Sequence, residues 1–168
     1  MNVAKDRSRD IETTLVVASQ ERLQNPTTSH GSQVLIIEGN SFTSLALMTQ
    51  FDYFEIKCDV SHYKVNALDK IESRIQSGEP FYDLILIDQY SLHNKGIELA
   101  ETICQKLSPP PYICIMSETD VQQKRVIDES DRAVVKSCML KPIFEAEILE
   151  LLMKAGLMPW KNIQSQFK

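Results

Sequence analysis

From residue 33 onward, runs of large apolar residues alternate with amphipathic stretches. A run of four apolar residues such as Leu84–Ile87 is typical of a strand covered on both faces, as in a parallel sheet. The pattern predicts strands at 34–37, 55–60, 84–87, 112–116 and within 134–140. It predicts helices at 41–54, 63–78, 95–107, 120–129 and 145–157.

Local signals refine three of these helices. Ser41 is a capping residue type and is expected to cap the first helix, whereas Gly78 suits the end of the second. In the second helix we expect one apolar stripe to face the core, namely Val65, Leu68, Ile71 and Ile75. In the last helix we expect the same of Ile148, Leu151, Leu152 and Ala155.

Five strand–helix units in succession predict an α/β fold. Short connections imply parallel strands, right-handed crossovers and helices on both faces of one five-stranded, doubly wound sheet. Residues 1–32, which end in a segment rich in small polar residues, Pro and Gly, are interpreted as a tail or linker. The predicted division is therefore a domain at 33–157 between tails at 1–32 and 158–168.

Composition narrows the functional class. Residues 1–32 hold equal numbers of basic and acidic side chains, so residues 33–168 carry the whole net charge of −5, which argues against direct nucleic-acid binding. No apolar run approaches the ~20 residues that a membrane span needs, and the N-terminus lacks the apolar segment of a secretion signal. Four widely spaced cysteines are expected to be buried thiols of a cytoplasmic protein.

Candidate reactive residues follow the predicted strands. The carboxyl ends of parallel strands meet at one edge, where ligands collect in open α/β folds. Glu38 follows the first strand, Asp88 the third, Ser117 the fourth and Lys141 the fifth. Two carboxylates can hold Mg²⁺, and a lysine with a hydroxyl suits a phosphoryl group. A carboxylate nucleophile in this setting indicates acyl-phosphate chemistry.

These residues and their spacing resemble the receiver domain of two-component response regulators. Asp88 ends the third strand and Gly96 lies eight residues later, while Ser117 ends the fourth strand and Lys141-Pro142 the fifth. The resemblance covers residues 33–157. It implies a flavodoxin-like, three-layer sandwich.

The resemblance also implies roles. Asp88 would accept a phosphoryl group from a phosphohistidine of a histidine kinase or histidine phosphotransfer protein. Ser117 would hydrogen-bond that group and Lys141 would pair with it. Glu38, Asp88 and the backbone carbonyl of Tyr90 would hold Mg²⁺. Phosphorylation would switch a face, built from 120–129, 134–140 and 145–157, that binds a downstream protein.

Such a domain is not an enzyme beyond transfer to, and hydrolysis from, its own aspartate. It would be cytoplasmic, either as a stand-alone receiver or as part of a hybrid kinase attached to the membrane.

Three departures from the family pattern matter. The family has two adjacent acids after the first strand, and here Gly39 replaces the second, so Mg²⁺ binding is expected to be weak. The loop Gln89–Lys95 lacks the family's Met-Pro. Cys138 stands where the family has a switch aromatic, so coupling by ring rotation is not expected.

Other interpretations stay open. The chain could be a pseudo-receiver, a protein-binding module that works without phosphorylation. Asp88 and Ser117 could merely cap following segments, Glu38 could be a solvated acid, and Lys141 a surface lysine. A dehalogenase-type phosphatase would need an acid two residues after its aspartate, where Tyr90 stands.

Overall fold

The computed structural model describes residues 33–157, and both predicted tails lie outside this range. In it, strands and helices alternate along the chain. The strands are β1 (Gln33–Ile37), β2 (Lys57–Ser61), β3 (Leu84–Asp88), β4 (Tyr112–Ser117) and β5 (Ser137–Leu140). The helices are α2 (Ser41–Tyr53), α3 (Lys64–Ser77), α4 (Gly96–Lys106), α5 (Asp120–Glu129) and α6 (Glu145–Lys154).

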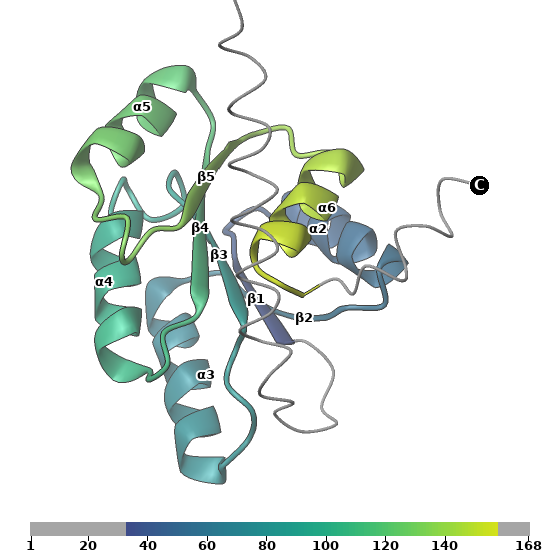
Figure 1. The fold of residues 1–168 in the computed structure, drawn as a ribbon, viewed down its shortest axis with the longest axis vertical. Helices are drawn as coiled ribbons and strands as arrows, with labels where there is room; N and C mark the ends of the chain where they lie inside the picture. Colours follow the sequence, from purple (N-terminus) through teal and green to yellow (C-terminus); the bar gives the residue numbers. More distant parts are fainter. Residues whose placement is uncertain (1–32, 158–168) are drawn as a thin grey trace, which may run out of the picture. The chain divides into compact units, whose positions relative to one another are not determined.

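The strands form one parallel sheet in the order β2-β1-β3-β4-β5. This order confirms the predicted doubly wound, flavodoxin-like fold. α3, α4 and α5 lie on one face of the sheet and α2 lies on the other (Figure 1). The chain reverses direction across the sheet between β1 and β3, so a crevice is expected outside the carboxyl ends of these two strands.

The central strand is buried throughout. Every residue of β3 is inaccessible to solvent, as its unbroken apolar run predicted. Alternate residues of β1, β3 and β4 pack with α3, α4 and α5 in one core cluster. Its strand members are Leu35, Ile37, Ile85, Ile87, Ile113 and Ile115.

The predicted core stripe of α3 is half confirmed, because Ile71 is buried in the core cluster and Leu68 packs against it, whereas the two end residues are wrong. Val65 and Ile75 are 66% and 41% exposed, and the buried residues are Ala67 and Ile71. The inward face continues one turn further with Arg74, whose side chain donates to Asp59 and lies 4.3 Å over the Tyr82 ring. A prediction from apolar periodicity considers apolar residues alone, so it named Ile75 and not the charged Arg74.

The ends of two helices show one wrong and one confirmed prediction. Asn40, not Ser41, caps α2, because its side-chain oxygen accepts hydrogen bonds from Phe42 N and Thr43 N. Gly78 ends α3 in the left-handed conformation with φ of 71°, as predicted.

The chain divides into two compact units, residues 31–148 and a second unit of residues 1–30 with 149–168. Only residues 149–157 of the second unit are described. The predicted stripe of α6 is confirmed by burial of Ile148, Leu151, Leu152 and Ala155.

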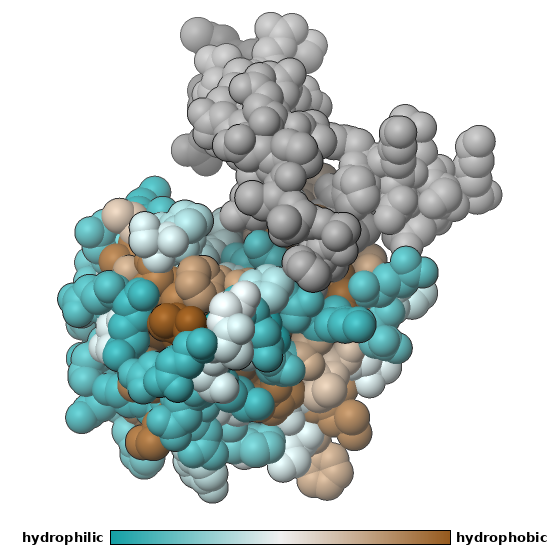
Figure 2. Space-filling model, turned by 90° about the horizontal axis from the view of Figure 1, so that it is seen from below, coloured by the Kyte–Doolittle hydropathy of each residue, from teal (hydrophilic) through white to brown (hydrophobic). Residues whose placement is uncertain are grey.

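One face of the described surface is mainly hydrophilic (Figure 2). Figure 2 shows one face, on which hydrophobic residues form small patches separated by hydrophilic ones. No helix within residues 33–157 is long and apolar enough to cross a membrane.

The loop from β3 to α4 is held by a buried glutamine. Gln89 is buried, and its Oε1 accepts a hydrogen bond of 3.0 Å from Gly96 N at the start of α4. Its backbone carbonyl accepts from Asn94 N. A Cβ on Gly96 would lie 2.2 Å from Gln89 Oε1, so this contact requires glycine.

We therefore expect Gly96→Ala to break the Gln89 contact and to lower the free energy of unfolding by about 1–3 kcal/mol, since a buried polar group loses its partner. Urea denaturation measures this loss. In the Gln89→Ala background the colliding atom is absent, so adding Gly96→Ala should cost little more. Fully additive losses would contradict the role given to Gln89.

Candidate functional site

Four side chains at the carboxyl edge of the sheet form what we call the acid pocket: Glu38, Asp88, Ser91 and Lys141. Strand register brings the two acids together. Ile37 of β1 pairs with Ile87 of β3, so the residues that follow them, Glu38 and Asp88, are neighbours. Both are only 1% exposed. The sheet thus places two carboxylates side by side and out of water.

Lys141 provides the countercharge. It follows β5, and its side chain crosses the end of β4 to reach both acids. Its Nζ lies 2.6 Å from Glu38 Oε2 and 2.7 Å from Asp88 Oδ1. Burial lowers the pKa of Lys141, but the hydrogen bonds and charges of Asp88 and Glu38 outweigh it and raise the pKa above its ordinary value of 10.5. The ammonium therefore stays charged at neutral pH.

Glu38 is fixed by its backbone as well as by Lys141. Its N–H donates to Ser61 O at 3.0 Å, and its carbonyl oxygen lies 2.9 Å from Nδ1 of His62. Its Oε1 accepts from Asn40 N at 2.8 Å. The alternative that Glu38 is a solvated acid is wrong.

Asp88 is held mainly by Ser91. The Ser91 N–H donates to Asp88 Oδ2 at 2.7 Å, and the Ser91 hydroxyl donates to the same oxygen. Asp88 therefore does cap the loop that follows it, as one alternative held. Its Oδ1 faces Lys141 in an ion pair but receives no hydrogen bond of ordinary angle.

Ser117 and Tyr90 lie beside the acid pocket with other partners. The fully buried Ser117 hydroxyl is 3.5 Å from Sγ of Cys138, the residue at the switch position. Thr119 caps α5, so the proposal that Ser117 caps it is wrong. The Tyr90 carbonyl accepts from His93 N at 3.0 Å.

The acid pocket fits a divalent cation only in part. Two buried carboxylates suit Mg²⁺, which is often held by one or two carboxylates and keeps several waters. However, no three His, Cys, Asp or Glu side chains converge into a metal cluster anywhere in residues 33–157. Glu38, Asp88 and the Tyr90 carbonyl thus remain the predicted ligands of a weak site.

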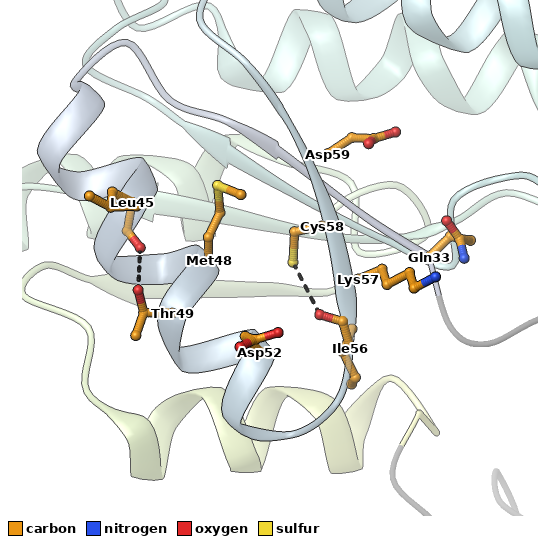
Figure 3. Close-up of a pocket in the computed structure, with 9 residues that line it drawn as sticks. All are labelled: Gln33, Leu45, Met48, Thr49, Asp52, Ile56, Lys57, Cys58 and Asp59. Carbon is orange, nitrogen blue, oxygen red and sulfur yellow. Dashed lines mark hydrogen bonds between the residues drawn. The ribbon is translucent and has the colours of Figure 1, made fainter.

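Two grooves lie outside the acid pocket. One of about 470 Å³ lies between α2 and residues 141–143, which follow β5; Phe42, Gln50, Glu118 and Lys141 are among its lining residues. It gives solvent access to the lysine. The other, of about 520 Å³, lies between α2 and the edge strand β2 (Figure 3).

The β2 groove contains a thiol that is not reactive. Burial, followed by the charges of Asp59 and Asp52, raises the pKa of Cys58 to about 12. Cys58 is therefore a protonated thiol at neutral pH, unsuited to nucleophilic chemistry. None of the four cysteines forms a disulfide, and Cys114 alone among them is fully buried.

Sequence reasoning found three of the four residues of the acid pocket and missed Ser91. Glu38, Asp88 and Lys141 come together as expected. Ser91 carried one available signal, a hydroxyl three residues after the aspartate in a loop without the family's Met-Pro. Nothing in that signal indicated contact with Gly39, 52 residues away.

Solved structures share this fold. A response regulator from Thermotoga maritima matches with a TM-score of 0.63 and 18% identity, over 77% of this chain and all of that one. A CheY-like receiver domain protein from Methanospirillum hungatei matches with a TM-score of 0.59 and 17% identity, over 83% of this chain and all of that one. A response regulator receiver protein from Burkholderia phymatum matches with a TM-score of 0.62 and 12% identity, over 77% of this chain and 98% of that one.

No protein-family model matches the chain, and no curated protein does. The structural matches show that residues of this chain adopt the receiver-domain fold.

Lys141→Met should leave two buried carboxylates without a countercharge. We expect a loss of about 3–5 kcal/mol in the free energy of unfolding at pH 7, measured by denaturant titration. The matched control is Lys64→Met, which breaks the exposed pair with Glu98 and should cost less than about 1 kcal/mol. Equal losses for the two variants would contradict the burial of the Lys141 pair.

The difference between wild type and Lys141→Met should also depend on pH. Because the pKa of Lys141 is raised in the folded state, its contribution is complete below the ordinary value of 10.5 and disappears as pH rises through the folded value. Denaturation at several alkaline pH values should therefore show the difference narrowing. A difference that widens there would contradict the assignment.

Proposed function

We propose that this chain, which has the receiver-domain fold, is the phosphoacceptor module of a two-component phosphorelay. Asp88 would take a phosphoryl group from a phosphohistidine of a histidine kinase or a histidine phosphotransfer protein. The supporting observation is the Lys141 ammonium held between two buried carboxylates at the end of β3. Lys141 could pair with the incoming phosphoryl group without leaving the acid pocket.

The proposed reaction is the transfer of a phosphoryl group from a histidine nitrogen to a carboxylate oxygen. A carboxylate oxygen of Asp88 bonds to phosphorus, the phosphorus–nitrogen bond breaks, and the imidazole keeps the electron pair and later takes a proton. The product is an acyl phosphate. Glu38, Asp88 and the Tyr90 carbonyl would hold Mg²⁺, whose charge would offset that of the phosphoryl oxygens.

Phosphorylation requires that the phosphodonor reach the side chain of Asp88. Asp88 is 1% exposed, so a donor reaches it only after Ser91 or Lys141 shifts. Lys141 and Phe42 line the same groove, and Phe42 itself is 87% exposed. A partner helix could dock against this aromatic side chain while Lys141 turns toward the phosphoryl group.

The output would be a charge-driven change in the acid pocket. Phosphorylation adds about −1.5 to −2 charge, and the Ser117 hydroxyl could leave Cys138 to donate to it. We propose that α5, β5 and α6 carry this change to a downstream protein. Val121 and Ile127, which are exposed on α5, are apolar contacts available to such a partner. The chain would turn over no substrate beyond its own acyl phosphate.

A second candidate is the pseudo-receiver, favoured by how Ser91 closes the acid pocket. The Ser91 hydroxyl donates a hydrogen bond to Asp88 Oδ2 and accepts one from Gly39 N. In the resting pocket Asp88 Oδ2 therefore already has a partner within the protein. In this function the fold would bind a partner through its surface, and Asp88 would serve only to neutralise Lys141.

Incubation with Mg²⁺ and a small acyl phosphodonor separates the two. We expect a mass gain of one phosphoryl group, reversed by hydroxylamine as an acyl phosphate should be, and abolished in Asp88→Asn. The matched control is Asp83→Asn, just before β3, where the carboxylate accepts from Gln33 N away from the acid pocket. This variant should be phosphorylated like the wild type.

The phosphoacceptor proposal fails if wild type gains no phosphoryl group at any Mg²⁺ concentration, and the pseudo-receiver then stands. A gain that persists in Asp88→Asn would also reject it, because the acceptor would lie elsewhere.

A further inference from the structure

Ser91 fills the space that a side chain at position 39 would need. A Cβ built on Gly39 would lie 2.7 Å from Ser91 Oγ and 3.0 Å from Ser91 Cβ. Neither distance allows an ordinary contact, so any side chain at 39 requires Ser91 to move. Gly39 and Ser91 are thus two halves of one packing arrangement, although 52 residues separate them in sequence.

The Ser91 hydroxyl also ties three groups of the acid pocket together. Its Oγ accepts from Gly39 N at 2.8 Å and donates its single hydrogen to Asp88 Oδ2. Glu38 Oε1 lies 3.4 Å away. With the Ser91 N–H on the same Asp88 oxygen, Oδ2 already has two donors. Any new ligand of Oδ2 must compete with both.

The acid pocket carries one negative charge fewer with Gly39 than it would carry with an aspartate at position 39. Two carboxylates and one ammonium give a formal charge of −1, whereas an aspartate at position 39 would give −2. Cation affinity at oxygen sites depends strongly on the number of charged ligands. The neutral hydroxyl of Ser91 fills the space that the carboxylate of an aspartate at position 39 would need.

We infer that Ser91, packed on Gly39, is a positioning residue that holds Asp88 Oδ2 and sets the low affinity of the acid pocket for divalent cations. A cation or phosphoryl oxygen that approaches Asp88 Oδ2 must first displace the Ser91 hydroxyl. The inference deepens the proposed function and rests on it in treating this pocket as the reactive site.

Mn²⁺ binding tests the inference directly, because free Mn²⁺ can be counted by its paramagnetic resonance signal. The proteins are wild type, Gly39→Asp, Ser91→Ala and the double variant Gly39→Asp/Ser91→Ala. We expect the double variant to bind Mn²⁺ at least about tenfold more tightly than wild type, since it gains a charge and the room for it. Gly39→Asp alone should gain much less, because its side chain meets Ser91.

Two controls isolate charge from packing. Ser91→Thr keeps the hydroxyl and should match wild type, whereas Ser91→Ala should gain a few-fold because Oδ2 loses one donor. Gly39→Asn/Ser91→Ala has the shape of the double variant without its charge and should bind Mn²⁺ no more tightly than Ser91→Ala does. If the double variant does not fold, the comparison of Ser91→Ala with Ser91→Thr decides.

The inference is overturned if Gly39→Asp alone binds as tightly as the double variant, or if the double variant gains nothing. Equal affinities of Ser91→Ala and Ser91→Thr would overturn it as well. Its failure is distinguishable from failure of the proposed function. Tight Mn²⁺ binding by the double variant beside a wild type that is never phosphorylated would reject phosphorylation and keep the role of Ser91.

Discussion

The ion pairs of Lys141 with Glu38 and Asp88 are the interaction on which the acid pocket depends. Two carboxylates that are both removed from water repel each other and lose hydration, and one ammonium at 2.6 and 2.7 Å offsets both costs. This arrangement ties the strand ends of β1, β3 and β5 into one unit. It also keeps the lysine charged, the state in which it can pair with a phosphoryl group.

Much of the fold could be predicted from the sequence because parallel strands buried on both faces leave unbroken apolar runs. Such runs located β1, β3 and β4, and the strand ends then placed Glu38 and Asp88 at one edge. The end of the inward face of α3 could not be predicted, because its last member is Arg74, a charged residue held by Asp59 and Tyr82. Apolar periodicity has no way to represent that contact.

In the acid pocket too, some residues could be predicted from the sequence pattern and others could not. Glu38, Asp88 and Lys141 follow from strand ends, which the register fixes. Ser91 and Gly39 meet only because two loops take particular courses, and no local spacing encodes that meeting. Gly39, which the sequence suggested was only a missing acid, packs against Ser91 and donates a hydrogen bond to its hydroxyl.

The central claim is that Asp88, though buried and ion-paired with Lys141 in the resting pocket, is the phosphoacceptor. Phosphorus NMR of the wild type with Mg²⁺ and an acyl phosphodonor tests it most directly. The account predicts a new protein-bound acyl-phosphate resonance that is absent from Asp88→Asn. A wild-type spectrum without that resonance, from protein shown to be folded, would contradict it.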